Sequence, residues 1–451
     1  MNRSHDLLND PIPQLLKTLA IPTSIGLFFN TMFNVVDTFF AGFVSTQALA
    51  ALSLSFPIFF LIIAVGAGIS SGATALIGHA VGAGDDTDAR KMAVQALSFG
   101  LLHGILLTLV GRLVSPALLS LLGAADSYME MALSYMDIIF AGSLFFIVNY
   151  VLNAILNATG DTRSFRNFLV AGFFLNLVLD PWFLFGGMGL PPLGLSGIAW
   201  ATVIVQLCGN IYLFSRARRT GLLDDLAWRA IFPERRPYMS LARLGFPASL
   251  NMLTVAIGFF VITWFISRFG KDAVAAYGIG TRIEQVVLLP VMGMNIATLA
   301  LVAQNSGARR MDRVREAVFT ALKVGVGLML VGTAAVYVAA EPLVGLFTRD
   351  EAVVRRGIEL LRVESLVFPA YVILYTSVYA LQGLKRPAFA VGIGFYRQFF
   401  GLLPFFYLFA NHFGWGLKGV WWGIFVVTWS AAGIAVWYIR RVLREIGSED
   451  V

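Results

Sequence analysis

The chain has 451 residues, of which 58% are hydrophobic and 13% charged, with a mean hydropathy of +0.78 and a formal net charge of +7. A soluble protein carries roughly a quarter of its residues as charged side chains, so this composition excludes the soluble classes and predicts a polytopic membrane protein. The basic excess falls in connecting segments, which argues against nucleic-acid binding, and the single cysteine excludes a disulfide framework.

Apolar runs of about 20 residues or more, separated by charged or Gly/Pro-rich breaks, predict an all-α integral membrane protein with twelve transmembrane helices. The expected limits are 14–40, 49–79, 91–112, 128–156, 165–186, 194–215, 241–267, 273–305, 315–340, 352–382, 388–410 and 416–439. Lys and Arg concentrate in one set of connecting segments, which the positive-inside rule assigns to the cytoplasm. We therefore expect both termini to be cytoplasmic.

The first predicted helix contains the stretch NTMFNVVDTFFAGFVS (30–45), in which a carboxyl group stands among aromatic residues. Asn30, Asn34 and Asp37 are spaced i, i+4 and i+7 and share one helix face. A charged residue at mid-membrane costs at least about 2.5–3.5 kcal/mol on insertion scales, so Asp37 should face protein or water. Pro22 lacks an N–H and should kink the same helix, either as a hinge or as a static bend.

Polar residues recur in the fourth to sixth predicted helices. Asn176 and Asp180 repeat the i, i+4 spacing, while Tyr135 and Thr202 fall about two turns from the outer ends of their helices. We expect these four side chains to meet Asp37 in the outer half of the N-terminal bundle. Two neighbouring carboxyl groups favour sharing a proton, and the same oxygens suit a hard cation such as Na⁺. The alternative is that the acids only hydrogen-bond between helices.

The fourth predicted helix also carries a stripe of asparagines at positions 149, 153 and 157. These residues are four apart and therefore share a helix face. We expect Asn153 and Asn157 to face either a central cavity or another helix, and Asn34 to be a further polar residue of that cavity.

An internal repeat divides the chain. A basic cytoplasmic linker (216–240) separates an N-terminal lobe (1–215) from a C-terminal lobe (241–451), each with six predicted helices. A shift of 225 residues places LAIPTS (19–24) on LGFPAS (244–249) and Gly82 on Gly307, and a shift of 222 places GLSGIAW (194–200) on GLKGVWW (416–422). Because both halves run in the same direction, the pattern predicts a parallel repeat of two bundles around a central cavity.

The acids of the first half are not repeated in the second. At the positions equivalent to Asp37 and Asp180 stand Ile262 and Phe405. The acid there is Glu284, near the middle of the eighth predicted helix, and Arg397 lies at similar depth on the eleventh. Two interpretations stay open, an ion pair between them or a site for substrate or ion.

These features together resemble the multidrug and toxic compound extrusion (MATE) family over about residues 10 to 440. The resemblance is carried by the two six-helix repeats, Pro22, the Asp37 region, IGHAVGAGD (77–85) and NLVLDPWF (176–183), and the acid set looks most like the prokaryotic DinF-like branch. It implies export of amphipathic, often cationic drugs or metabolites in exchange for H⁺ or Na⁺, by a monomer in the inner (cytoplasmic) membrane of a bacterium or archaeon.

Residue by residue, the resemblance assigns the coupling-ion role to Asp37, Asn176 and Asp180, and less directly to Tyr135 and Thr202. Pro22 matches the proline where the first helix bends, and Glu284 matches an acid that some branches use for the cation. The second acid of those branches is absent from the eleventh helix, where Arg397 stands. We expect no cofactor and no metal other than Na⁺.

Other functions are weighed against antiport. A flippase for a lipid-linked or other amphipathic substrate is the alternative, and a pyrophosphate group would require a strongly basic cavity. Only Arg282, Arg362 and Arg397 are available to supply one. An enzyme would require a nucleophile and base or metal ligands, which no His, Cys and Asp pattern offers, so we expect a transporter and no catalytic residues. A channel would favour identical polar residues in both halves.

Overall fold

The computed structural model describes residues 6–124, 126–187, 189–224 and 228–449. Over these residues the chain is helical and has no β-strand, apart from an isolated bridge between Gly187 and Leu190. Ten of the described helices are long and apolar enough to cross a membrane, or eleven when the bent pair α4–α5 is counted as one span. The predicted all-α class is therefore confirmed.

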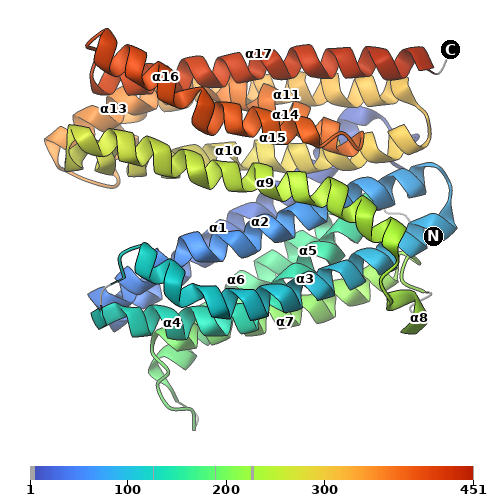
Figure 1. Ribbon diagram of the computed structural model, residues 1–451, viewed down its shortest axis with the longest axis horizontal. Helices are drawn as coiled ribbons and strands as arrows, with labels where there is room; N and C mark the ends of the chain where they lie inside the picture. Colours follow the sequence, from blue (N-terminus) through green and yellow to red (C-terminus); the bar gives the residue numbers. More distant parts are fainter. Residues whose placement is uncertain (1–5, 125, 188, 225–227, 450–451) are drawn as a thin grey trace. The chain divides into compact units, whose positions relative to one another are not determined.

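Contacts divide the chain, whose helices are labelled in Figure 1, into two compact units. Helix α1 contributes residues to both units. Ile25–Ser249 belong to the first unit, whereas Leu7–Ser24 belong to the second together with the residues from Leu250 onward. The helices as far as the linker are α1 (Ile12–Val44), α2 (Thr46–Gly82), α3 (Asp86–Leu121), α4 (Asp126–Ala141), α5 (Ser143–Ala158), α6 (Arg163–Phe185), α7 (Leu195–Arg218) and α8 (Trp228–Ile231).

The later helices begin with α9, whose first part belongs to the first unit. They are α9 (Arg235–Ile266), η1 (Ser267–Phe269), α10 (Lys271–Gly307), α11 (Met311–Val338), α12 (Ala340–Gly345), α13 (Glu351–Ser365), α14 (Phe368–Gly383), α15 (Ala388–Phe395), η2 (Tyr396–Phe400), α16 (Leu402–Phe406), η3 (Tyr407–His412) and α17 (Leu417–Glu449). Both η2 and η3 are π-helical turns within one apolar span, Ala388–His412.

The helix boundaries confirm the predicted parallel repeat. Helices α2 and α10 each have 37 residues, and both start and end 225 positions apart. Helices α3 and α11 begin at Asp86 and Met311, again 225 apart. Helices α7 and α17 begin at Leu195 and Leu417, 222 apart. These three pairs of helices thus recur in the same order in the two halves.

Two predicted helices are interrupted in the structure, at equivalent positions of the repeat. The predicted helix 128–156 is bent by 45° between α4 and α5, at Gly142. The predicted helix 352–382 is divided into α13 and α14 at Leu366 and Val367, and Val367 is 225 positions after Gly142. Hydropathy does not reveal the bend at Gly142, because the residues on either side of it are apolar, whereas the break at Leu366 and Val367 directly follows the charged helix α13.

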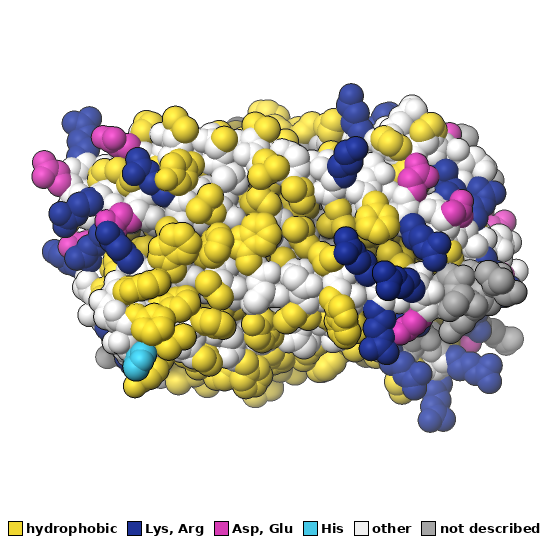
Figure 2. Space-filling view, turned by 90° about the horizontal axis from the view of Figure 1, so that it is seen from above, with side chains coloured by type: hydrophobic (Ala, Val, Ile, Leu, Met, Phe, Trp, Pro, Cys, Tyr) yellow, Lys and Arg dark blue, Asp and Glu magenta, His cyan; other side chains and the backbone are white. Residues whose placement is uncertain are grey.

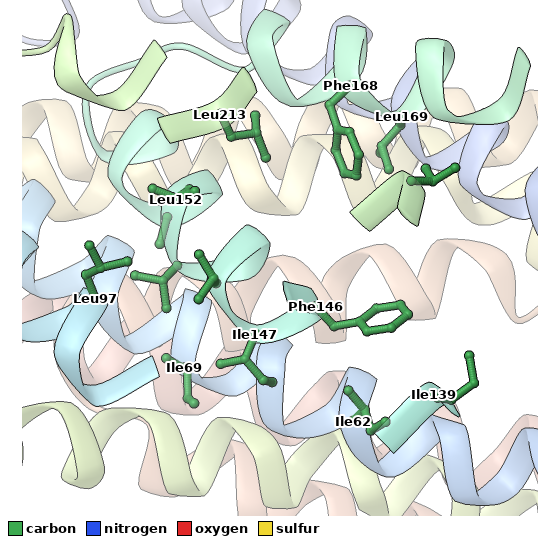
Figure 3. Close-up of a cluster of buried hydrophobic side chains, with 14 of the residues drawn as sticks. Ile62, Ile69, Leu97, Ile139, Phe146, Ile147, Leu152, Phe168, Leu169 and Leu213 are labelled. Atoms are coloured by element: carbon green, nitrogen blue, oxygen red, sulfur yellow. The ribbon is translucent and has the colours of Figure 1, made fainter. Parts of the chain in front are cut away.

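The core of the first unit is built around α5, which is buried along nearly its whole length. Figure 3 shows Ile147 and Leu152 of α5 close to Ile69 of α2 and Leu97 of α3. Glycines bring the surrounding helices close: a Cβ on Gly100 of α3 would lie 2.7 Å from a methyl group of Val151. This packing holds rigid the helices that flank the polar residues described below.

The close approach of α2 to α9 predicts a stability effect. A Cβ on Gly68 would lie 2.5 Å from the backbone N of Ser249 and 2.6 Å from the carbonyl O of Gly245. Because backbone atoms cannot move aside cheaply, Gly68→Ala should destabilise the protein by about 1–3 kcal/mol. Thermal unfolding in detergent should show a lower midpoint. Gly42→Ala, whose Cβ would meet only a leucine methyl at 3.6 Å, should leave the midpoint unchanged, and equal midpoints for both variants would contradict the expectation.

Hydrophobic side chains cover the middle of the long helices, and Lys and Arg gather toward their ends (Figure 2). Several large apolar side chains are exposed, among them Leu113 of α3, Val178 of α6 and Phe260 of α9. Apolar exposure of this kind is unusual for a protein surrounded by water and is expected for one surrounded by lipid.

Candidate functional site

The first unit brings two acids and an amide together in its interior. The Asn176 Nδ2 group donates hydrogen bonds to Asp37 Oδ1 at 2.6 Å and to Asp180 Oδ2 at 2.9 Å. Asp37 is 6% exposed, and Asn176 and Asp180 are fully buried. One amide of α6 therefore links a carboxyl group of α1 to a carboxyl group of its own helix.

Local helix geometry explains this arrangement. Asn176 and Asp180 are four residues apart on α6, so their side chains lie one above the other on one face. Pro181 follows directly within the helix and cannot donate to the carbonyl of Leu177, which weakens the backbone ladder beside the acids. On α1, Asp37 is the buried member of the predicted polar stripe, whereas Asn30 is exposed.

Thr202 and Tyr135 complete the surroundings. Thr202 Oγ1 donates to the carbonyl of Ile198 at 3.0 Å and lies 3.5 Å from Asp37 Oδ2, at the outer limit of a hydrogen bond. Tyr135 of α4 is buried and interacts electrostatically with both Asp37 and Asp180. Four helices, α1, α4, α6 and α7, thus contribute to one polar cluster, which we call the acidic cluster (Asp37, Tyr135, Asn176, Asp180 and Thr202).

Acceptors outnumber donors in the acidic cluster. Asp180 Oδ1 and Asn176 Oδ1 are buried and receive no hydrogen bond from any described residue. A buried acceptor without a donor costs about 1–3 kcal/mol, so the cluster has an energetic reason to take up a donor or a cation. A proton on a carboxyl group or a hard cation bound by these oxygens would each satisfy it.

The other predicted polar residues of the first unit lie apart from this hydrogen-bonded set. Asn34 donates to the carbonyl of Asn30 on its own helix, at 2.8 Å. Asn149 of α5 donates to the carbonyl and side chain of Gln206 on α7, at 2.9 and 2.8 Å, and so joins two helices. Asn153 and Asn157 are buried, and Asn153 Oδ1 has no donor among the described residues. Whether they line a cavity stays a prediction.

Pro22 lies within α1, in a segment where the helical hydrogen bonds are weakened. It cannot donate to the carbonyl of Thr18. The next two residues, Thr23 and Ser24, turn their hydroxyl groups back onto the carbonyls of Leu19 and Ala20, at 2.8 Å each, a pattern that often bends helices. Immediately after Ser24, α1 passes from the second unit to the first.

The second unit contains a different cluster. Arg397 of η2 donates to the hydroxyl of Tyr375 at 2.9 Å, and no described carboxylate lies within the 4.0 Å of an ion pair. Glu284 interacts electrostatically with Arg397 from beyond ion-pair distance and with Glu364 of α13. Reasoning from the sequence did not assign roles to Tyr375 or Glu364, because apolar-span analysis does not show which helices meet.

The side chains of the described residues are not arranged as they are in metal-binding sites. Among them, no cluster of three or more His, Cys, Asp or Glu side chains has a geometry suited to a metal ion. The acidic cluster has two carboxyl groups with amide, phenol and hydroxyl oxygens, which is a donor set for a proton or Na⁺ and not for a transition metal.

Comparison with known proteins identifies close relatives. A family model described as MatE matches residues 22–182 and again 247–408, so the two matches begin 225 residues apart. The chain is 31% identical over 458 residues to a protein of Shewanella oneidensis named FAD transporter, covering 99% of this chain and 98% of that one. It is 25% identical over 440 residues to the multidrug export protein MepA of Staphylococcus aureus, covering 96% and 95%.

A solved structure has the same fold. It is that of a transporter of the MOP superfamily from Pyrococcus furiosus, described as having a binding pocket of reverse polarity, and it matches with a TM-score of 0.91. The two sequences are 26% identical, and the match covers 98% of each chain.

Proposed function

The chain belongs to the MatE family of multi-pass membrane transporters, and from this premise we propose that it is a secondary active antiporter. It exports amphipathic small molecules in exchange for H⁺ or Na⁺ by alternating access. The acidic cluster is the coupling site, with Asp37 and Asp180 as the groups that take up the ion.

The observation that carries this proposal is the hydrogen bond of Asn176 to both acids, in a cluster with unfilled acceptors. Ionisable residues within membrane spans are expensive to bury and are therefore rare unless they serve function. Packing alone would be satisfied by a neutral amide pair and would not need two buried acids linked by one donor. The arrangement thus supports reversible uptake of a positive charge.

Ion uptake must favour one conformation over another in order to drive transport. Asp37 lies on the part of α1 that belongs to the first unit, fifteen residues after Pro22. When the ion neutralises the cluster, the hydrogen bond from the Asn176 amide to Asp37 is no longer needed to stabilise a buried negative charge. The part of α1 that carries Asp37 can then move away from α6. We propose that the weakened segment at Pro22–Ser24 then acts as the hinge at which α1 changes its bend.

Proline removal tests the hinge. Pro22→Ala restores an N–H that can donate to the carbonyl of Thr18, so α1 should become straighter and stiffer. We expect a slower initial rate of export and unchanged affinity for the substrate, measured in proteoliposomes. Pro57→Ala, which changes a proline inside α2, is the matched control. If Pro22→Ala exports at the wild-type rate, Pro22 only bends α1 and does not act as a hinge.

Two substrate classes are supported. Resemblance to multidrug exporters favours amphipathic, often cationic compounds. The 31% identity to a named FAD transporter over nearly the whole chain favours a flavin nucleotide instead. Both classes pair a flat aromatic system with a charged group, but the sign of the charge is opposite.

Transport in proteoliposomes with separately imposed pH and Na⁺ gradients tests the function. The gradient of the coupling ion should drive accumulation of a fluorescent cationic dye or of FAD, and the other gradient should not. Equal transport with either gradient and with none would contradict antiport. We further propose that the protein acts as a monomer in the cytoplasmic membrane, with both termini and the linker 216–240 on the cytoplasmic side.

A further inference from the structure

The second unit contains a buried cation on an irregular turn of helix. Arg397 is 8% exposed and lies in η2, one of two π-helical turns in the span Ala388–His412. A π-helical turn changes the direction in which side chains point and is frequent at functional sites. Here it leaves two successive residues, Arg397 and Gln398, both buried. Successive residues of a regular helix point about 100° apart, so the irregular turn helps to direct both inward.

Two tyrosines frame the guanidinium group. Tyr371 and Tyr375 of α14 are stacked, with ring centroids 5.8 Å apart and planes inclined by 20°. The Cζ atom of Arg397 lies 5.2 Å from the centre of the first ring and 5.5 Å from that of the second. An aromatic platform beside a guanidinium group combines stacking with a planar, permanent positive charge.

Within the described part of the chain, no carboxylate lies at ion-pair distance from Arg397. Its near partners are the tyrosine hydroxyls, which are neutral groups. Glu284 acts on Arg397 from beyond ion-pair distance and also interacts electrostatically with Glu364. A guanidinium group has five N–H donors, so most of its hydrogen-bonding capacity is left for another partner.

We propose that Arg397, with Tyr371 and Tyr375, is the site that recognises an acidic group attached to an aromatic ring system in the transported substrate. A phosphate or carboxylate forms charge-assisted hydrogen bonds with the guanidinium group, and the ring system lies against the tyrosines. This rests on the proposed transport function and narrows its substrate to acidic aromatic compounds. The acidic cluster of the first unit takes no part in this recognition.

A pair of flavins isolates the acidic group. FMN and riboflavin have the same ring system, and only FMN carries a phosphate. Their binding to the purified full-length protein in lipid nanodiscs, without any ion gradient, is followed by quenching of flavin fluorescence. We expect the wild type to bind FMN more tightly than riboflavin. Arg397→Gln should weaken FMN binding by about 10- to 100-fold, the range for hydrogen bonds to charged groups, and should leave riboflavin binding unchanged.

Three further variants separate recognition from packing. Arg362→Gln is the matched control, because Arg362 of the second unit also lies over a tyrosine ring, with its Cζ atom 5.6 Å from the centre of the Tyr337 ring. Unlike Arg397, Arg362 is exposed. Arg362→Gln should not change the FMN preference. Tyr375→Phe keeps the ring and should weaken FMN binding less than Arg397→Gln. Glu284→Gln removes a negative charge near Arg397 and should tighten FMN binding.

Several outcomes would overturn the inference. The first is absence of saturable FMN binding, and the second is equal affinity of the wild type for both flavins. The third is an equal loss of affinity for FMN and for riboflavin in Arg397→Gln. The last result would indicate that Arg397 only supports the fold. Gradient-driven export of FMN by the wild type in proteoliposomes tests the proposed function in a separate assay. If that assay fails while phosphate-dependent binding is intact, antiport is rejected and the proposed recognition site is still supported.

Discussion

We expect replacement of Asp37 by Asn to abolish gradient-driven export while the protein still inserts and folds. Asparagine has the same shape, and its carbonyl oxygen can still accept the hydrogen bond from Asn176 that now reaches Asp37 at 2.6 Å. It can take up neither a proton nor the charge of a bound cation at neutral pH. Only Asp180 can then take up the ion, and its uptake no longer changes the charge that α1 carries in the cluster, so the ion gradient cannot act on α1.

The measurement is export in proteoliposomes under each imposed gradient, with insertion checked by size-exclusion chromatography. Asp137→Asn provides a matched control, because Asp137 also lies in a predicted span but is half exposed and lies 3.5 Å from Arg112 in an ion pair. The control should export at the rate of the wild type. Normal gradient-driven export by Asp37→Asn would remove the acidic cluster from the mechanism.

Replacement of Asn176 by Leu has the second large effect, on both stability and export. The change removes the donor that serves Asp37 and Asp180 and leaves both buried carboxyl groups without it. An unsatisfied buried polar group costs about 1–3 kcal/mol. We therefore expect a lower midpoint of thermal unfolding and a loss of ion-driven export to the level of empty liposomes.

Asn34→Leu is the control for the stability part, because among the residues that the structure describes the Asn34 amide donates only to the carbonyl of Asn30 on its own helix. Its unfolding midpoint should stay close to that of the wild type. Should Asn176→Leu unfold at the wild-type temperature and export normally, the linked acids would be a feature of packing without a role in coupling.

Much of the fold is predictable from the sequence, because a membrane span is a local property. About 20 apolar residues in succession must form a helix, since backbone groups in lipid have no other hydrogen-bond partners. The repeat is equally visible, because landmarks such as Pro22 and Pro247 recur at a constant offset. The ends of α2 and α10, at Gly82 and Gly307, follow the same offset.

The interruptions were not predictable in the same way. The bend at Gly142 lies within an apolar run, the break at Leu366–Val367 separates the charged helix α13 from the apolar helix α14, and the π-helical turn at Arg397 has no sign in the composition. Such irregularities depend on how neighbouring helices pack and on whether their backbone groups find other partners. They decide where the side chains beside them point.

The sequence by itself determined the helices, their repeat and the fact that Asp37, Asn176 and Asp180 stand within apolar segments, because hydropathy and helical spacing are local. Only the tertiary structure decided which polar side chains meet. Asn34 shares a helix with Asp37 but bonds to its own backbone, whereas Asn176, 139 positions away, reaches the acid. Glu284 and Arg397, at similar predicted depth, form no ion pair among the described residues. The difference lies in helix rotation and packing, which long-range contacts determine.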